Sequence, residues 1–297
     1  MSLEAEIRSI IAESGAEMGV CIRHLETGAE IAVDADRVFP LASVFKIPVL
    51  VEAFRQLHAG RFRMEERWEV TTAEKNLPSG VLVFCADGLK PTARDLITLM
   101  IIISDNTATD MVMHRLGVEN VTKTMHGLGL TDIHVPLTVR GIFTDLYASA
   151  DPTQDLLALA KQSSRRDGVA YSDSPQNDVG TPRALTDLLG MIWRGEIVSR
   201  AACDGMLEIL LKQQLNERLP RFLPPGVPFA HKTGTLGCIR NDSGILYAND
   251  NSHIAVTAFC RWDDQAVAHD PAAKWDRIVA IDSAFGKIGR AVYKQYK

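Results

Sequence analysis

The stretch FPLASVFKIPVL, residues 39–50, is apolar except for one hydroxyl, on Ser43, and one amine, on Lys46. If the segment is helical, residues three apart share a face, so the hydroxyl and the amine lie side by side. Apolar surroundings lower the pKa of a lysine, which can then act as a base and turn a neighbouring serine into a nucleophile. The alternative is that Lys46 extends from a core helix to water. Because roughly one Ser-x-x-Lys arises by chance in a chain of this length, the pattern needs independent support.

Composition limits the classes of function. The chain has 297 residues, of which 46% are hydrophobic and 23% charged, as in ordinary soluble globular proteins. The net charge of -5 and the lack of a basic run argue against binding to nucleic acid or to an anionic membrane. No apolar run reaches the ~18 residues that a membrane-spanning helix needs. We therefore expect a monomer that acts on a small molecule.

The five cysteines are odd in number and far apart, which predicts free thiols in a reducing compartment. No spacing typical of a metal, nucleotide or dinucleotide site occurs, so neither a metal nor a cofactor is expected. The N-terminal stretch MSLEAEIRSIIAES has apolar residues at Leu3, Ile7, Ile10 and Ile11, the pattern of an amphipathic helix rather than a signal peptide. The chain as given therefore predicts a cytoplasmic protein, or a periplasmic or secreted one if a leader has been removed. The cysteines are Cys21, Cys85, Cys203, Cys238 and Cys260.

Predicted strands lie at both ends of the sequence and predicted helices in its middle. Alternating residues over 18–33 indicate a hairpin, and HKTGTLG, SGILYAND and SHIAVTAFCRW indicate three more strands joined by short turns. Short turns imply an antiparallel sheet, which the terminal helices can cover. The fold class is therefore α/β, of the α+β type. We expect a sheet lobe from residues 1–42 and 204–297, a mainly helical lobe from residues 43–203, and the site in the cleft between them.

Three short motifs follow one another along the chain. Ser43-Val44-Phe45-Lys46 precedes Ser104-Asp105-Asn106, at the end of a predicted buried helix, and Lys232-Thr233-Gly234, on a predicted strand. Each has an ordinary structural explanation alone, but chance is a poor explanation for all three in this order. Together they resemble the SxxK, SDN and KTG set of class A serine β-lactamases and penicillin-binding proteins. GLKPTARDLITLMIIISDNTATD and TPRALTDLL are also similar to that family. The resemblance implies a three-layer fold with a five-stranded antiparallel sheet.

The resemblance also implies a role for each motif residue. Ser43 attacks an amide or lactam carbonyl and forms an acyl-enzyme, Lys46 accepts its proton, and Ser104 and Lys232 relay a proton to the leaving nitrogen. The backbone N–H groups of Ser43 and Thr235 form the oxyanion hole. The remaining expected contacts with substrate come from Asn106, Thr233, Gly234 and Thr235.

The chain departs from the family in the segment that should activate the deacylating water. No E-x-x-L-N motif occurs, and KQSSRRDGVAYSDSPQNDVG, residues 161–180, contains no glutamate. Two alternatives stay open for the loop acids: Asp178 pairs with Arg165 or Arg166 and pins the loop, or each acid is solvated. The acids are Asp145, Asp151, Asp155, Asp167, Asp173 and Asp178.

A second departure concerns the arginine that should bind the carboxylate of the substrate. Ser243 lies near its expected position, and Arg240 either substitutes for it or caps a surface turn. Acylation machinery without a deacylation base predicts a β-lactamase-like serine hydrolase that releases its product slowly. The alternatives are a D-Ala-D-Ala carboxypeptidase-like enzyme and a small-molecule esterase or amidase. A non-catalytic penicillin-binding sensor is the least supported, because it has no need of Lys46, Ser104 and Lys232 together.

Overall fold

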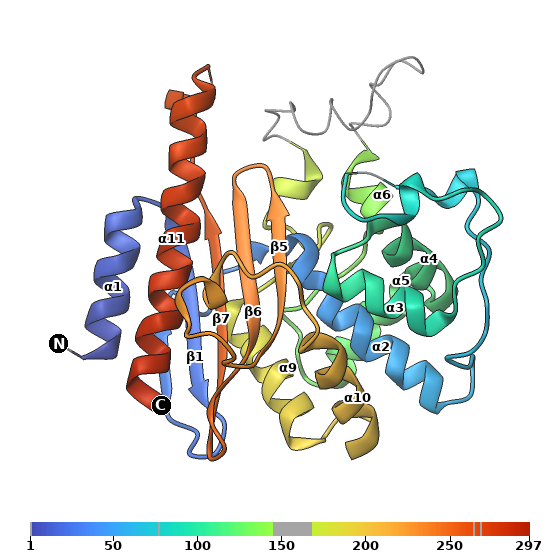
Figure 1. The fold of residues 1–297 in the computed structure, drawn as a ribbon, viewed down its shortest axis with the longest axis horizontal. Coiled ribbons are helices and arrows are strands. Elements are labelled where there is room, and N and C mark those ends of the chain that lie inside the picture. Colours follow the sequence, from blue (N-terminus) through green and yellow to red (C-terminus); the bar gives the residue numbers. More distant parts are fainter. Residues whose placement is uncertain (1, 77, 145–167, 264, 268) are drawn as a thin grey trace.

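Five antiparallel strands form the central sheet of the protein, in the order β2-β1-β7-β6-β5 (Figure 1). This computed structural model describes residues 2–76, 78–144, 168–263, 265–267 and 269–297. The sheet confirms the predicted fold class. Its strands are β1 (Glu17–His24), β2 (Glu30–Val33), β5 (Phe229–Leu236), β6 (Ile239–Asn249) and β7 (Ser252–Arg261).

Strand β1 joins the two ends of the chain. On one side it pairs with β2, where Val20 lies opposite Val33 and Arg23 opposite Glu30. On the other side it pairs with β7 along its whole length. Strand β7 pairs with β6, and β6 with β5, through short turns. The N-terminal hairpin and the three C-terminal strands therefore make one sheet.

Two terminal helices cover one face of the sheet. Helices α1 (Leu3–Ser14) and α11 (Pro271–Tyr296) lie side by side there (Figure 1). Ser2 caps the start of α1, and Gly15 ends it with a φ of 59°, a left-handed conformation that glycine adopts at little cost. Apolar side chains of α1, α11 and the sheet form one hydrophobic core, which includes Ile7, Val256 and Phe285.

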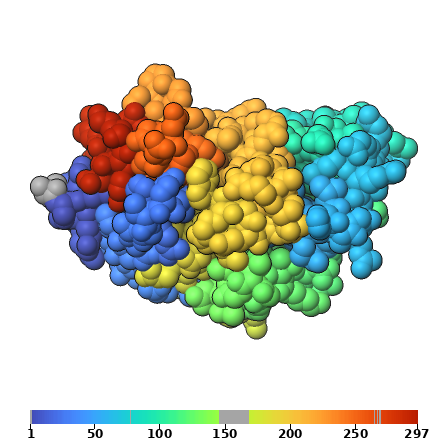
Figure 2. Space-filling view, turned by 90° about the horizontal axis from the view of Figure 1, so that it is seen from below, coloured from blue at the N-terminus to red at the C-terminus, as the bar shows by residue number. Residues whose placement is uncertain are grey.

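Helix α9 (Pro182–Arg194) covers the opposite face, where it packs against β7 and β1. Thr181 caps it and Pro182 is its first residue, a common arrangement at the start of a helix. Helix α10 (Arg200–Leu210) packs against α9, α2 and β5. In the view from below, the yellow and gold segments of α9 and α10 lie between the sheet and the cyan segment of the helical region (Figure 2).

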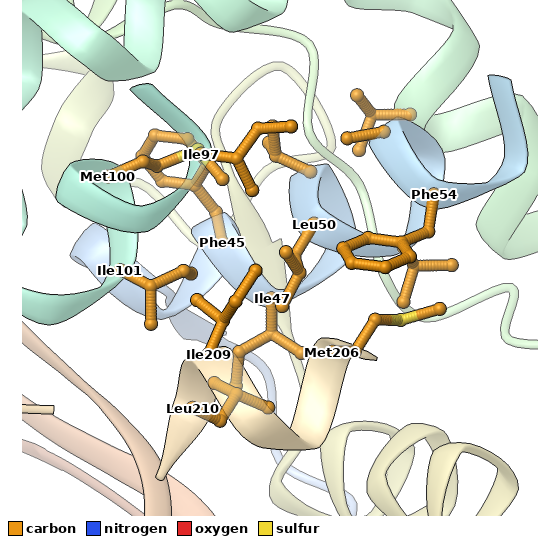
Figure 3. Close-up of a cluster of buried hydrophobic side chains, with 14 of the residues drawn as sticks. Phe45, Ile47, Leu50, Phe54, Ile97, Met100, Ile101, Met206, Ile209 and Leu210 are labelled. Carbon is orange, nitrogen blue, oxygen red and sulfur yellow. The ribbon is translucent and has the colours of Figure 1, made fainter. Parts of the chain in front are cut away.

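The helices between the two sheet segments share a second hydrophobic core. Phe45, directly before α2, and Ile47 and Leu50, in its first turns, face apolar side chains of α3 and α10 (Figure 3). Thr92 and Asp95 form a capping box at the start of α3. The turn that leads into α2, residues 42–45, packs against β5 and β6. The helices are α2 (Lys46–His58), α3 (Ala93–Ile102), α4 (Asn106–Leu116), α5 (Val118–Gly127) and α6 (Val139–Ile142).

Short elements connect these layers. Strands β3 (Phe39–Pro40) and β4 (Val179–Gly180) pair beside the first turn of α2. Within the described residues, no helix is long and apolar enough to cross a bilayer. The lobe boundaries at residues 42 and 203 stay a prediction. The short helical turns are η1 (Ala42–Phe45), η2 (Thr72–Glu74), η3 (Leu82–Phe84), η4 (Val169–Tyr171), η5 (Leu219–Phe222) and η6 (Gln265–Val267).

Candidate active site

Ser43 lies in η1, the turn that leads directly into α2. This turn is 3₁₀ rather than α-helical. Ser43 lies within it, and Lys46, three residues later, is the first residue of α2. The residue before Ser43, Ala42, has a φ of 43°, an unfavourable conformation for a residue with a side chain. Such backbone strain is typical of functional sites, where the surrounding structure enforces it.

The Lys46 side chain is completely buried and surrounded by oxygen atoms. Its Nζ donates hydrogen bonds to the backbone oxygen of Ser104 at 2.9 Å, to Ser104 Oγ at 3.0 Å and to Asn106 Oδ1 at 2.9 Å. Burial lowers the pKa of Lys46 to about 7, although the negative charges of Asp105 and Asp110 act in the opposite direction. With this pKa, Lys46 is a mixture of both forms near pH 7: the ammonium form donates all three bonds, and the neutral form, with two N–H groups, has a lone pair that can accept a proton.

The Ser104-Asp105-Asn106 motif connects α3 to α4. Ser104 has a φ of 58°, a second strained residue in the site. The Asp105 carboxylate accepts hydrogen bonds from the backbone N–H groups of Ala108, at 2.9 Å, and of Val81, at 2.6 Å. Asp105 thereby caps α4 and fixes the loop around it, so that Ser104 and Asn106 both face Lys46.

The Lys232-Thr233-Gly234 motif lies near the end of β5, on the other side of the nucleophile. Lys232 is completely buried, and its Nζ donates to the backbone oxygen of Thr233 at 2.7 Å. Burial, followed by the positive charges of Lys46 and Arg218, holds the pKa of Lys232 well below its ordinary value. The site therefore concentrates cationic groups that have lost their contact with water.

Gly234 permits close approach between β5 and the turn of the nucleophile. A Cβ atom at this position would lie 2.7 Å from the backbone oxygen of Leu41 and 3.2 Å from the backbone nitrogen of Ser43. The first distance is too short for any side chain unless the backbone moves. The glycine thus brings the β5 backbone to the start of the Ser43 turn.

Asn241, which the sequence analysis did not single out, connects the sheet to this turn. Its Nδ2 donates to the backbone oxygens of Pro40, at 2.8 Å, and Leu41, at 2.9 Å. Its Oδ1 accepts from the backbone nitrogen of Cys260 on β7. Only the pairing of β5 with β6 reveals this role, because Asn241 lies opposite Gly234 in the register.

Arg240 does not lie at the pocket. Its guanidinium donates to the backbone oxygens of Gly237 and Ile239 and lies 5.3 Å from the ring centre of Trp262. A different arginine, Arg218, donates through Nη2 to Thr235 Oγ1. Arg218 lies 14 residues before Lys232 in the chain, in no recognisable motif, so no signal in the sequence pointed to it.

The pocket beside Ser43 has polar and apolar sides. Ser104, Asn106, Thr233 and Thr235 supply polar atoms, whereas Val139, Ile142 and Phe143 form an apolar side at α6. None of the lining residues in the described part of the chain carries a carboxylate. The described residues also contain no group of three or more His, Cys, Asp or Glu side chains placed to hold a metal. The pocket is lined by Ala42, Ser43, Phe45, Pro78, Ser79, Ser104, Asn106, Val139, Ile142, Phe143, Leu215, Thr233, Thr235 and Leu236.

Two of the candidate loop acids belong to the described residues, and neither lines the pocket. Asp173 pairs with Arg261 on β7. Asp178 is buried, and its Oδ1 accepts from the backbone nitrogen of Leu137 at 3.0 Å. Burial raises the pKa of Asp178 well above its ordinary value. Its expected partners, Arg165 and Arg166, lie outside the described residues, as do Asp145, Asp151, Asp155 and Asp167.

Comparison with known proteins agrees with the motifs and the fold. The profile of the family described as "Beta-lactamase enzyme family" matches residues 2–296. The "Beta-lactamase regulatory protein BlaB" of Streptomyces cacaoi is 27% identical over 274 residues, which are 86% of this chain and 88% of BlaB.

Solved structures of this family superpose on nearly the whole chain. A β-lactamase from Sphaerobacter thermophilus DSM 20745 has a TM-score of 0.78 and 26% identity, and the match covers 99% of this chain and 96% of that one. A mutant of PBP-A, solved as an acyl-enzyme complex with penicillin G, has a TM-score of 0.75 and 25% identity, with coverages of 99% and 95%. The chain therefore belongs to the beta-lactamase enzyme family, with a fold like that of the class A enzymes.

Proposed function

We propose that the protein is a serine hydrolase that forms an acyl-enzyme at Ser43 with a β-lactam or a related amide. The observation that carries this proposal is the environment of Lys46. Its amine is buried, bonded to Ser104 and Asn106, and has a pKa lowered to about 7. A general base requires a pKa close to the working pH, and this amine combines such a pKa with a direct contact to Ser104.

Each group has a step in acylation. Ser43 Oγ attacks the carbonyl carbon while the neutral amine of Lys46 accepts its proton. The N–H groups of Ser43 and Thr235 stabilise the oxyanion of the tetrahedral intermediate, where one such donor is typically worth ~2.7–4 kcal/mol. The C–N bond then breaks, and Ser104, which already contacts Lys46, delivers a proton to the departing nitrogen, with Lys232 beside it.

The substrate carries an anionic group that lies toward β5. Lys46, Lys232 and Arg218 lie close together, and after burial the positive charges of Lys46 and Arg218 help to lower the pKa of Lys232, although Arg218 also pairs with Asp282 at 3.3 Å. A bound carboxylate would offset the repulsion between these charges. Thr233 and Thr235 line that end of the pocket, and we propose that Arg218 polarises the Thr235 hydroxyl, in the role first considered for Arg240.

Release of the acyl group is slow. Hydrolysis requires a base that activates water at the ester, and the described lining offers only apolar side chains on its α6 side. A D-Ala-D-Ala carboxypeptidase-like enzyme and a small-molecule esterase or amidase use the same acylation groups and stay as alternatives. The regulatory role of the relative BlaB is compatible with a persistent acyl-enzyme.

Intact-protein mass spectrometry during reaction with benzylpenicillin and with a chromogenic cephalosporin tests the proposal. We expect a single covalent adduct on Ser43. Its lifetime should be much longer than the time that an efficient β-lactamase needs for one turnover. The Ser43→Ala variant should form no adduct and keep its melting temperature, because no hydrogen bond of the Ser43 side chain holds the described structure together.

Other outcomes assign other functions. An adduct that disappears while substrate is consumed would indicate an efficient β-lactamase, with its deacylation base outside the described residues. No adduct with either compound would shift the proposal to a different ester or amide, which a panel of D-Ala-D-Ala peptides and small esters would then identify.

A further inference from the structure

The pocket has two unlike sides. Thr233 and Thr235 line it at β5, with the Arg218 guanidinium bonded to Thr235 and the buried Lys232 next to Thr233 in the strand, whereas apolar side chains line it at α6. Val139 is almost completely buried, but Ile142 and Phe143 are half-buried, so part of their apolar surface faces the pocket. The leaving-group side of a substrate is drawn to β5 by charge. The acyl substituent must therefore lie on the remaining side, against α6.

Helix α6 is a rigid surface although it is short. Thr138 caps it through the backbone nitrogen of Gly141, at 3.1 Å. The buried carboxylate of Asp110 accepts hydrogen bonds from the backbone N–H groups of Val139, at 2.7 Å, and Arg140, at 2.9 Å. The Arg140 guanidinium in turn donates to the backbone oxygen of Lys75 at 3.0 Å. These bonds anchor the start of the short helix whose end carries Ile142 and Phe143.

The same surface disfavours charge. No described lining residue on the α6 side can pair with an ammonium group or a carboxylate. A charged substituent placed there would lose its water without gaining a partner, which is costly, whereas an apolar group would gain from burial.

We propose that Val139, Ile142 and Phe143 form a binding site for an apolar acyl substituent, so that the substrate is a carboxylate-bearing amide with an uncharged, apolar acyl side chain. This inference rests on the proposed acyl-enzyme at Ser43. It distinguishes this chain's substrate from peptides and lactams whose acyl side chain carries an amine or a second carboxylate.

Three penicillins provide a matched test. Benzylpenicillin, ampicillin and carbenicillin share the same nucleus and phenyl group, and differ at one carbon, which carries hydrogen, an ammonium group or a carboxylate. We expect the second-order rate constant for acylation of Ser43, measured by rapid quenching and mass spectrometry, to be at least about tenfold higher for benzylpenicillin than for either charged analogue.

Variants locate the effect. Phe143→Ser and, separately, Ile142→Ser should slow acylation by benzylpenicillin. In both variants, the ratio of the acylation rate constant of benzylpenicillin to that of either charged analogue should fall to about threefold or less. Melting temperatures of both variants show whether they remain folded. Phe84→Ser, which changes a phenylalanine that is 71% exposed and outside the pocket lining, should leave the ratio unchanged.

The outcomes separate the two proposals. Adducts that form equally fast with all three penicillins would overturn the apolar site and leave the acyl-enzyme proposal intact. A ratio that persists in both α6 variants, or that is lost in Phe84→Ser, would likewise overturn the assignment to α6. Absence of any adduct on Ser43 would overturn the acyl-enzyme proposal and this inference with it.

Discussion

The two sides of the pocket differ in the polarity of the side chains that surround them. On the nucleophile side, Lys46 and Lys232 are completely buried and their amines are held by hydrogen bonds to oxygen atoms. On the α6 side, Ile142 and Phe143 present only carbon to the pocket. In the proposed mechanism, formation of the acyl-enzyme uses groups of the first side, whereas its hydrolysis needs a base on the other. The contrast is the basis for proposing fast acylation with slow release.

The largest expected effect comes from removing the base of the polar side. Lys46→Ala should slow acylation by benzylpenicillin by ~10²–10⁴-fold, the usual contribution of general-base catalysis. Stopped-flow measurement of the acylation rate constant checks this.

Lys212→Ala is the matched control, because Lys212 is an exposed lysine whose amine pairs with Glu208, one helical turn before it. Its acylation rate should equal that of the unchanged protein. Acylation of Lys46→Ala at a similar rate would mean that another group accepts the proton of Ser43.

The next effect tests the apolar side. Ile142→Glu places a carboxylate on a half-buried position of the pocket lining, where it can activate water, and we expect the lifetime of the penicillin adduct to shorten by about 100-fold. The decay of the adduct mass after removal of free penicillin gives this lifetime.

Ile142→Gln separates basicity from shape, since glutamine has the size of glutamate without its charge. Its adduct should decay as slowly as that of the unchanged protein. Equal acceleration by both variants would show that access of water, rather than a missing base, limits release.

The motif residues and the sheet could be predicted from the sequence because each has a local signature. Thr92 and Asp95 form a capping box, Thr181 and Pro182 start a helix, and strands with short turns pair in chain order. The sequence left two alternatives for Lys46, burial among apolar residues or extension to water, and the structure shows that the side chain is completely buried.

Other parts of the site depend on register and packing, which no single segment encodes. Asn241 reaches the nucleophile turn only because β6 pairs with β5 so that Asn241 lies opposite Gly234. Arg218 contacts Thr235 from an irregular segment, and Arg240 faces Trp262 because of its position in the strand. Sequence proximity to the motif therefore favoured Arg240, while three-dimensional contact favours Arg218.

A smaller, graded effect is expected from pH. The pKa of Lys46 is lowered to about 7, and only its neutral form is a base. The second-order acylation rate constant should therefore rise with pH, reach half its maximum near pH 7 and fall about tenfold for each pH unit below it.

Bound substrate should shift the pH at which acylation reaches half its maximum rate. A carboxylate near Lys46 and Lys232 favours their charged forms, so the acylation rate at saturating penicillin should reach half-maximum at a higher pH than the second-order constant. A rate that keeps rising through about pH 9 in the free enzyme would contradict the lowered pKa of Lys46.

The smallest expected effect distinguishes the two arginines of the polar side. Arg218→Gln should reduce acylation by benzylpenicillin about tenfold, because it removes a positive charge from Thr235, but it should leave acylation by the methyl ester of benzylpenicillin nearly unchanged. Arg240→Gln should affect neither compound, since that guanidinium contacts backbone oxygens and Trp262. The ratio of the acylation rate with benzylpenicillin to the rate with its methyl ester corrects for any general loss of folded protein, because such a loss lowers both rates equally. The opposite result would be slower acylation by benzylpenicillin, but not by its methyl ester, in Arg240→Gln, with no change in Arg218→Gln. It would assign carboxylate recognition to Arg240, whose side chain would then have to rotate toward the pocket when substrate binds.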